Sequence, residues 1–259
     1  MTAAAAHAFE EIAAILDDAM RKRAPVARIV DRHPDLTHAD AYAIQEKVVA
    51  RRLGRGGRMV GIKMGLTSRA KMQQVGVNEA IWGRLTSDMS VEEGGAVESD
   101  RFIHPRTEPE IAYLLGRDLA GDETPAAIAA AVEAAMPALE IIDSRYRGFK
   151  FGPADVIADN TSAAGFVVGA PFGRNIDLSN LGIVLEVDGR TVQTGSSAAI
   201  LGHPLRALVR AARLAAEAGL PLRAGQVVLA GAATAAHPCQ RGTVVQAIFG
   251  RNRISVEFG

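Results

Sequence analysis

The first fifty residues carry apolar side chains at helical spacing. Such residues recur every three or four positions, and the set is Phe9, Ile12, Ala13, Leu16 and Met20. The spacing predicts an amphipathic helix that ends before Pro25. Thr37 and Asp40 have the spacing of a capping box, which predicts a second helix beginning after Thr37.

A glycine-rich run, residues 54–57, follows this second predicted helix. Glycines of this kind end helices and separate segments that differ in their spacing of apolar residues. We interpret the run as a hinge. Residues 1–57 are then a helical N-terminal lobe, and residues 58–259 are a β-rich domain that would carry any catalytic residues.

From residue 58 the pattern changes to short apolar runs between turn residues, which is typical of strands. The predicted strands cover residues 60–64, 108–115, 137–142, 165–169, 183–187, 190–192, 227–229, 243–249 and 253–258. Asp188-Gly189 fits a type I′ turn and predicts a hairpin. Thr124-Pro125 predicts a short helix over residues 126–135, and Pro204 opens another that ends at Gly219. Many strands with few helices indicate an α+β fold with a mixed, strongly curved sheet.

Composition narrows the class of protein. Of the 259 residues 48% are hydrophobic, and the 29 basic and 29 acidic residues balance, so no global field recruits nucleic acid or an anionic membrane. No apolar run approaches the roughly 20 residues that span a bilayer. Cys239 is the single cysteine, which excludes an intrachain disulfide and suits a reducing compartment. We therefore expect a cytoplasmic protein.

The clearest candidate chemistry lies in the predicted strand at residues 108–115. Glu108 and Glu110 are two positions apart, so in a strand both carboxylates point to the same face. Two like charges so close require a positive group between them, either a metal ion or a basic side chain. The alternative is an exposed acidic strand end.

A third acid, Glu140, lies among apolar residues in the segment 136–142, where a buried carboxylate needs a partner. Three carboxylates together would form an all-oxygen site for Mg²⁺ or Mn²⁺. The alternative partner for Glu140 is a salt bridge to Arg145 or Arg147.

Lys63 is a further candidate, because an ammonium group between apolar strand residues can point into a cleft and bind a carboxylate. The alternative is a lysine whose stem is buried and whose head reaches solvent. Ser68 is a candidate cap for a helix over residues 69–72. His104 and His203 are interpreted as turn or capping residues, and Cys239 as a residue without a catalytic role.

Several segments together resemble one family, the hydratase/decarboxylase branch of the fumarylacetoacetate hydrolase superfamily. They include the run Gly61-Ile62-Lys63-Met64-Gly65-Leu66-Thr67-Ser68. The others are residues 71–72, 76–78, 85–89, 101–111, 137–147, 158–160 and 201–204. They stand in the family's order over roughly residues 40–258.

The resemblance implies a curved mixed β-sheet or barrel of the fumarylacetoacetate hydrolase type. It implies that Glu108, Glu110 and Glu140 bind Mg²⁺ or Mn²⁺ and that Lys63 contacts the 2-oxo acid end of a substrate. It further suggests roles for Arg145, Lys150 and Ser162, as contacts for a second carboxylate or as parts of the pocket wall. One departure is Ala232, which stands where the family usually has glycine. Because of this departure, the resemblance defines the class of substrate better than it defines the particular substrate.

Within this branch the chain is more similar to the decarboxylases than to the hydratases. Residues 141–151 resemble the decarboxylase sequence, and Ile81 replaces an aspartate that the hydratases carry. Hydration needs a group that handles a proton, which isoleucine cannot do.

The resemblance therefore implies Mg²⁺-dependent decarboxylation of a small 2-oxo dicarboxylate, 2-oxohex-3-enedioate. It also suggests a homo-oligomer and a complex with the hydratase that takes the product. The alternatives are hydration of 2-hydroxypentadienoate, hydrolysis of an acylpyruvate, and a non-catalytic partner subunit.

Overall fold

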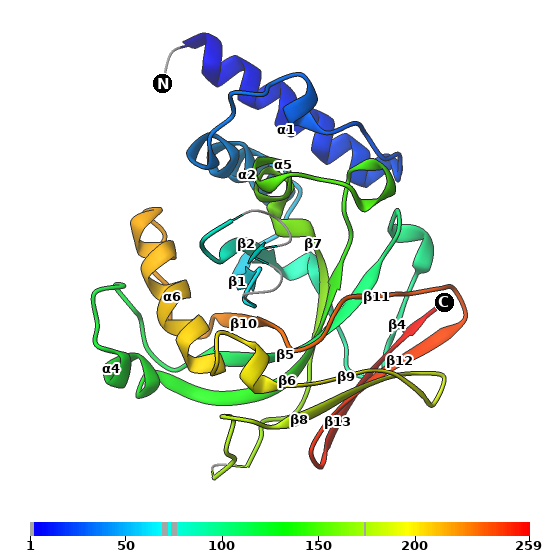
Figure 1. The fold of residues 1–259 in the computed structure, drawn as a ribbon. Coiled ribbons are helices and arrows are strands. Elements are labelled where there is room, and N and C mark those ends of the chain that lie inside the picture. The colour runs from blue at the N-terminus through cyan, green and yellow to red at the C-terminus, as the bar shows by residue number, and fades with distance from the viewer. Residues whose placement is uncertain (1–2, 69–71, 74–76, 174) are drawn as a thin grey trace.

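Two long helices open the chain (Figure 1). The computed structural model describes residues 3–68, 72–73, 77–173 and 175–259, so the predicted helix after Ser68 lies mostly outside the described residues. Helix α1 spans Ala3–Lys22 and helix α2 spans His38–Leu53. The capping box is confirmed, because the Asp40 amide donates to Thr37 Oγ1 and the Thr37 amide donates to the Asp40 carboxylate.

These helices pack against helix α5 (Pro153–Ala158), which comes from the second half of the chain. The shared apolar core includes Phe9, Leu16, Ile44 and Ile157. The glycine run at residues 54–57 joins α2 to the first strand. The division of the chain at residue 57 stays a prediction, and the packing of α5 ties the N-terminal helices to a later part of the chain.

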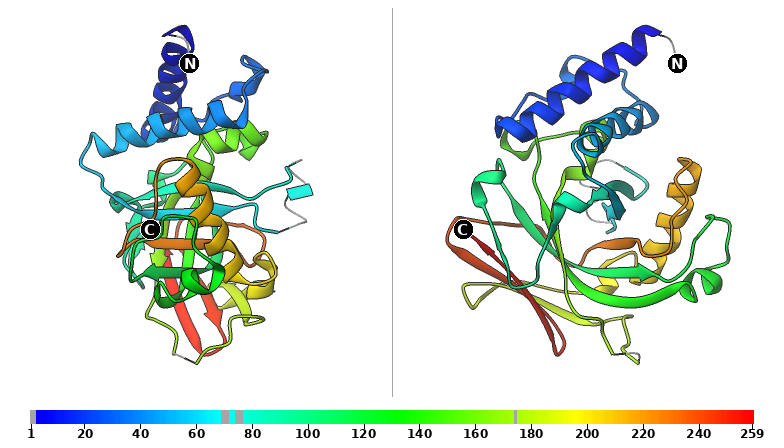
Figure 2. Two further views of the ribbon diagram at one scale, coloured as in Figure 1. Left: turned by 90° about the vertical axis from the view of Figure 1, so that its left-hand side faces the viewer. Right: turned by 180° about the vertical axis from the view of Figure 1, so that it is seen from behind.

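A curved sheet holds the centre of the molecule (Figures 1 and 2). Among the described residues it has eight strands: β1 (Met59–Gly65), β2 (Ile81–Thr86), β3 (Ser90–Val91), β5 (Arg106–Leu115), β6 (Val132–Ile142), β7 (Ala163–Val168), β10 (Val227–Ala232) and β11 (His237–Pro238). Their order is β2-β1-β10-β5-β6-β7-β3, with β11 beside β5. The β1–β10 and β3–β7 pairs are parallel and the others are antiparallel, so the sheet is mixed as predicted.

A second sheet closes one side of the core. Its strands are β4 (Ala96–Val97), β8 (Gly182–Val187), β9 (Arg190–Ser196), β12 (Thr243–Phe249) and β13 (Asn252–Phe258), in the order β4-β13-β12-β8-β9. The predicted hairpin between β8 and β9 is confirmed. Asp188 and Gly189 have φ of 50° and 73°, the left-handed values that a type I′ turn requires.

Two further helices differ in how well the sequence predicted them. Helix α6 spans Pro204–Glu217, and the His203 side chain caps it by accepting from the Leu205 amide at 3.0 Å. Helix α4 covers only Pro125–Ala129, so the predicted helix over residues 126–135 is wrong beyond its first turns. Residues 132–135 instead pair with β5, and this long-range pairing outweighs the helix propensity of the alanines.

The described residues also form short 3-10 helices: η1 (Ile29–Asp31), η2 (Ser87–Met89), η3 (Ser99–Arg101), η4 (Arg147–Phe149), η5 (Asn160–Ser162) and η6 (Ser197–Ala199). The main core lies between the two sheets and α6. The α+β prediction with a curved mixed sheet and a helical N-terminal region is confirmed. Among the helices described, none is long and apolar enough to cross a membrane.

Gly61 allows β1 to approach β10 closely, and it provides a test of this pairing. A Cβ atom at Gly61 would lie 1.8 Å from the Val227 carbonyl oxygen. We expect Gly61→Ala to lower the free energy of unfolding by about 3 kcal/mol or more, because backbone must move to relieve the overlap. Urea unfolding followed by circular dichroism measures this change.

Gly182→Ala is the matched control, since a Cβ at Gly182 meets no atom within 4 Å. A Gly61→Ala variant as stable as Gly182→Ala would contradict the close approach of β1 and β10.

Candidate metal centre and active site

Three glutamates meet on adjacent strands of the main sheet. Glu108 and Glu110 project from the same face of β5, and Glu140 lies directly opposite Glu108 on β6. One carboxylate oxygen from each residue lies within 4.8 Å of the other two. Glu110 and Glu140 are fully buried and Glu108 is 8% exposed, so the alternative of an exposed acidic strand end is wrong.

Lys63 on β1 reaches this cluster from the other side of β10. Its Nζ lies 2.9 Å from Glu140 Oε2 and donates to the Thr161 carbonyl at 3.1 Å. Lys63 is 3% exposed, which excludes a head group in solvent. The partner of Glu140 is therefore Lys63 rather than Arg145 or Arg147.

Burial and neighbouring charge move the pKa values of these groups. Burial alone would lower the pKa of Lys63, but the charges of Glu140, Glu110 and Glu108 outweigh it and raise the pKa above its ordinary value. Burial raises the pKa of Glu140 to about 7. Burial, together with the charge of Glu140, raises the pKa of Glu110 well above its ordinary value. Burial and mutual repulsion therefore disfavour the ionised forms of Glu110 and Glu140.

The donor set fits a divalent cation. Three carboxylates converge here, with one oxygen of each within 4.8 Å of the others, and such a set can bind a divalent ion. Within the described residues, Glu110 Oε1 and Glu140 Oε1 accept no hydrogen bond although both are buried. Buried acceptors without partners are costly, and hard oxygen ligands suit Mg²⁺ or Mn²⁺.

A β-bulge in β10 orients one of the three carboxylates. The pairing of β10 with β5 shifts between Leu229 and Ala232, and in this bulge the Gly231 amide donates to Glu110 Oε2 at 2.7 Å. Bulges beside active sites commonly aim a polar group in this way. Ala232, the departure from the family's glycine, lies opposite Glu110, is buried, and does not line the cavity described next.

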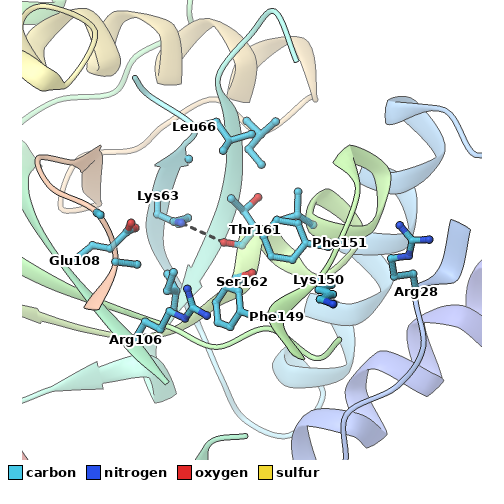
Figure 3. A pocket seen from close by; sticks show the side chains of 16 residues that line it. Arg28, Lys63, Leu66, Arg106, Glu108, Phe149, Lys150, Phe151, Thr161 and Ser162 are labelled. Atoms are coloured by element: carbon cyan, nitrogen blue, oxygen red, sulfur yellow. Dashed lines mark hydrogen bonds between the residues drawn. The ribbon is translucent and has the colours of Figure 1, made fainter. Parts of the chain in front are cut away.

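A cavity of about 540 Å³ opens over Glu108 and Lys63 (Figure 3). Its wall is formed by Arg28, Lys63, Gly65, Leu66, Ile81, Arg106, Glu108, Ile142, Phe149, Lys150, Phe151, Val156, Thr161, Ser162, Ala235 and Ala236. In Figure 3, Glu108 and Lys63 lie at one end and Lys150 and Arg28 at the other. The cavity therefore has an acidic inner end and a cationic outer end.

Aromatic and aliphatic side chains form the middle of this cavity. Phe149 and Phe151 contact each other with ring centroids 5.8 Å apart, and Ile81 is 4% exposed. The Arg106 guanidinium lies 4.0 Å from the centroid of the Phe149 ring, a cation–π contact. A ligand in the cavity is largely surrounded by apolar groups between two charged ends.

The turn at residues 160–162 has strained backbone beside the cavity. Asn160, Thr161 and Ser162 are consecutive non-glycine residues with φ of 50°, 54° and 59°. Such conformations cost energy and persist where neighbouring contacts hold them. Here the Asn160 side chain bonds the backbone of Arg84, and Thr161 Oγ1 donates to the Trp82 carbonyl at 2.7 Å. The turn presents the Thr161 carbonyl to Lys63 and leaves Ser162 Oγ buried at the cavity.

The structure brings together most of the candidates from the sequence. Lys63, Glu108, Lys150 and Ser162 line the cavity, and Glu110 and Glu140 lie behind Glu108. Ser162 Oγ has no hydrogen-bond partner among the described groups, which suits a ligand contact.

Arg145 is the exception, because it does not line this cavity. Its guanidinium is 3% exposed and donates to the carboxylate of Asp159 and to the Asp143 carbonyl. It is therefore directed into the protein, where its charge pairs with that of Asp159.

Sequence reasoning missed two cations of the cavity, Arg28 and Arg106. The signal for Arg106 was present, because it stands two residues before Glu108 and so shares its face of β5. Arg28 carried no local signal, since it lies in the connection between α1 and α2. Cys239, interpreted as a bystander, does not line the cavity, and burial raises the pKa of its thiol to about 11.

Fold and site together define a class of protein. Residues 70–254 match the sequence profile of the fumarylacetoacetate (FAA) hydrolase C-terminal family. The chain belongs to the fumarylacetoacetate hydrolase family.

Relatives within this family are more specific. The chain is 59% identical to a 4-oxalocrotonate decarboxylase of Pseudomonas sp. over 192 residues, 72% of this chain and 75% of the relative. It is 40% identical over 213 residues to a 2-keto-4-pentenoate hydratase of Paraburkholderia xenovorans, 81% of this chain and 79% of the relative. A solved structure of 4-oxalocrotonate decarboxylase from Pseudomonas putida G7, complexed with magnesium and adipate, superposes with a TM-score of 0.93 at 36% identity. It covers 100% of this chain and 99% of that one.

The raised pKa values predict that Mg²⁺ binding depends on pH. With the pKa of Glu140 at about 7 and that of Glu110 raised well above its ordinary value by burial, protons occupy these carboxyls at low pH and compete with the ion. We expect the dissociation constant for Mg²⁺ to fall at least about ten-fold between pH 6 and pH 8. Isothermal titration calorimetry in buffers of different ionisation enthalpy measures both the affinity and the protons released. An affinity that does not change over this range would show that the carboxyls are already ionised.

Proposed function

We propose that the chain is a divalent-metal-dependent carboxy-lyase that decarboxylates 2-oxohex-3-enedioate, also called 4-oxalocrotonate. The observation that carries the proposal is the cluster of Glu108, Glu110, Glu140 and Lys63 at the inner end of a cavity whose wall also carries apolar side chains. The identity of 59% to a 4-oxalocrotonate decarboxylase supports the reaction, and the magnesium in the related structure supports the ion.

The inner end would hold the 2-oxo acid group of the substrate. The three glutamates would hold Mg²⁺ or Mn²⁺, which when bound supplies a Lewis acid to this end of the substrate. Lys63 would hold an ammonium charge near the 2-oxo oxygen, since its raised pKa keeps it protonated at neutral pH. This charge stabilises the oxygen as negative charge develops on it.

The distal carboxylate would leave as CO₂ when the bond between C5 and C6 breaks. The electron pair left at C5 conjugates through the C3–C4 double bond to the 2-oxo oxygen. A proton on that oxygen then gives 2-hydroxypenta-2,4-dienoate. Ile81 and the phenylalanines of the cavity would exclude water from C5 and disfavour the charged carboxylate relative to neutral CO₂. Ser162 Oγ, buried and without a hydrogen-bond partner among the described residues, would contact the substrate between the two ends.

An ultraviolet assay tests this proposal directly. Purified protein is mixed with 2-oxohex-3-enedioate with and without Mg²⁺, and CO₂ is measured in parallel. Loss of substrate that requires Mg²⁺ and yields one CO₂ per molecule is the expected result. Substrate that remains unchanged, or that is lost without CO₂, would refute the decarboxylase assignment.

The second candidate function is hydration of 2-hydroxypenta-2,4-dienoate, and the hydratase relatives at about 40% identity favour it. The two reactions differ in product, since hydration yields a 4-hydroxy-2-oxo acid and no CO₂. Hydrolysis of an acylpyruvate would yield two acids instead. A non-catalytic partner subunit would turn over none of these substrates and would leave the glutamate cluster without a use.

Replacing Glu110 with Gln tests the metal centre. The change removes one negative charge and one ligand oxygen, and we expect Mg²⁺ affinity to fall at least about ten-fold, with activity at fixed Mg²⁺ falling in parallel. Glu133→Gln on β6 is the matched control, because Glu133 is exposed. Calorimetry with Mg²⁺ and the CO₂ assay measure the two effects. Near-native activity of Glu110→Gln would remove Glu110 from the ligand set.

Ile81→Asp tests the apolar wall. A carboxylate at this buried position brings charge and water to the cavity, so we expect decarboxylation to slow at least about ten-fold while Mg²⁺ binding persists. Ile81→Val keeps the wall apolar and serves as the control. Unchanged CO₂ release by Ile81→Asp would show that the wall does not contribute to the rate.

We also propose that the chain forms a homo-oligomer and associates with the hydratase that consumes its product. The support is the family resemblance, in which decarboxylase and hydratase act on successive intermediates. Light scattering of the chain alone, and then with a purified hydratase, tests both statements. A mass equal to one chain in the first sample would refute the homo-oligomer, and a second sample with no species heavier than the separate proteins would refute the association.

A further inference from the structure

The connection between α1 and α2 reaches the outer end of the cavity. Residues 25–33 contain η1 and lie against the loop at residues 143–151, which follows β6. From this connection Arg28 lines the cavity together with Lys150 of the loop (Figure 3). The N-terminal helical region therefore contributes a charged group to the site that the sheet builds.

Backbone hydrogen bonds hold this connection on the loop. Val26 pairs with Tyr146 as an isolated parallel bridge. The Val26 amide donates to the Arg145 carbonyl at 2.9 Å, and the Arg147 amide donates to the Val26 carbonyl at 2.9 Å. The Val30 amide donates to the Asp155 carboxylate at 3.1 Å. Arg28 lies between these fixed points, two residues from each.

The buried side chain of Arg145 holds the loop at residues 143–151 in place through hydrogen bonds. Its guanidinium donates to the Asp159 carboxylate and to the carbonyls of Asp143, Asp159 and Ala163. Because the carbonyl of the same residue accepts from Val26, the position of Arg28 depends on this buried network. Arg145 is thus a positioning residue that acts through Arg28.

The charges at the outer end are available to an anion. No carboxylate among the described residues pairs with Lys150, which is exposed. Arg28 pairs with Asp31, whose oxygen lies 2.6 Å from the guanidinium, and the side chains of both residues are 47% exposed. An ion pair so exposed to solvent is weak, so a ligand carboxylate can take the place of Asp31.

We propose that Arg28, with Lys150, binds the outer carboxylate of a dicarboxylate ligand and sets the preference of the site for dicarboxylates. A guanidinium forms two parallel hydrogen bonds with a carboxylate, which gives both affinity and orientation. The inference rests on the proposed function for the class of ligand, a 2-oxo acid with a second carboxylate. It adds that the selectivity for this second carboxylate comes from the N-terminal region.

A matched pair of ligands tests this inference without turnover. 2-Oxoadipate and 2-oxohexanoate share the 2-oxo acid group, and only 2-oxoadipate has a distal carboxylate. Neither has the C3–C4 double bond that makes loss of CO₂ favourable. Calorimetry on the full chain with Mg²⁺ gives both dissociation constants. We expect the unaltered protein to bind 2-oxoadipate about ten-fold more tightly or better.

Arg28→Gln should remove most of this preference, weakening 2-oxoadipate about ten-fold and leaving 2-oxohexanoate unchanged. Arg32→Gln is the control, because Arg32 is exposed, lies in the same connection and does not line the cavity. Asp31→Asn should tighten 2-oxoadipate several-fold, since it removes the competing carboxylate. Arg145→Lys should reduce the preference in the same way as Arg28→Gln while 2-oxohexanoate still binds.

A preference for 2-oxoadipate that survives in Arg28→Gln would overturn the inference, whatever the enzyme does with its substrate. An equal loss of the preference in Arg32→Gln would also overturn it. Such a loss would show that the preference depends on the net positive charge of the connection and not on Arg28 itself. The proposed function is tested separately by release of CO₂. If CO₂ release fails and the Arg28-dependent preference remains, the site still selects dicarboxylates and only the reaction is wrong.

Discussion

The contact between Lys63 and Glu140 is the interaction on which the rest of the site depends. Three carboxylates in a protein core would repel one another and lose their hydration, and one ammonium at 2.9 Å compensates only part of that charge. The converging carboxylate oxygens are the ligands that a divalent cation such as Mg²⁺ prefers. The strands that carry these groups must hold them against repulsion, which the long β5–β6 pairing and the bulge in β10 accomplish.

Local rules in the sequence predicted much of this arrangement. The period of two in a strand placed Glu108 and Glu110 on one face, and the cost of a buried charge identified Glu140 and Lys63 as groups that need partners. The capping box at Thr37 and the Asp188-Gly189 turn were readable because each depends on residues close in the chain. The family resemblance assigned chemistry to these groups, which periodicity alone left open.

What the sequence did not predict depends on contacts between distant residues. Residues 132–135 have the composition of a helix and become strand because β5 offers a pairing partner. Arg145 shows the same limit, since the Asp159 carboxylate and the carbonyls of Asp143, Asp159 and Ala163 hold its side chain inside the protein. Arg28 lines the cavity because a bridge between Val26 and Tyr146 holds its segment beside the loop at residues 143–151. Val26 and Tyr146 are 120 positions apart, so no local sequence pattern predicts this contact.

The place of β10 in the sheet has a consequence for the order in which the protein is made. β10 lies between β1 and β5, and so it joins the strand of Lys63 to the strand of the first two glutamates. Residues 227–232 follow the strands of Lys63 and of all three glutamates in the chain, so they leave the ribosome after those strands. Until β10 is made, the strand that joins Lys63 to Glu108 and Glu110 in the sheet is missing, so the native sheet order at the charged centre cannot form.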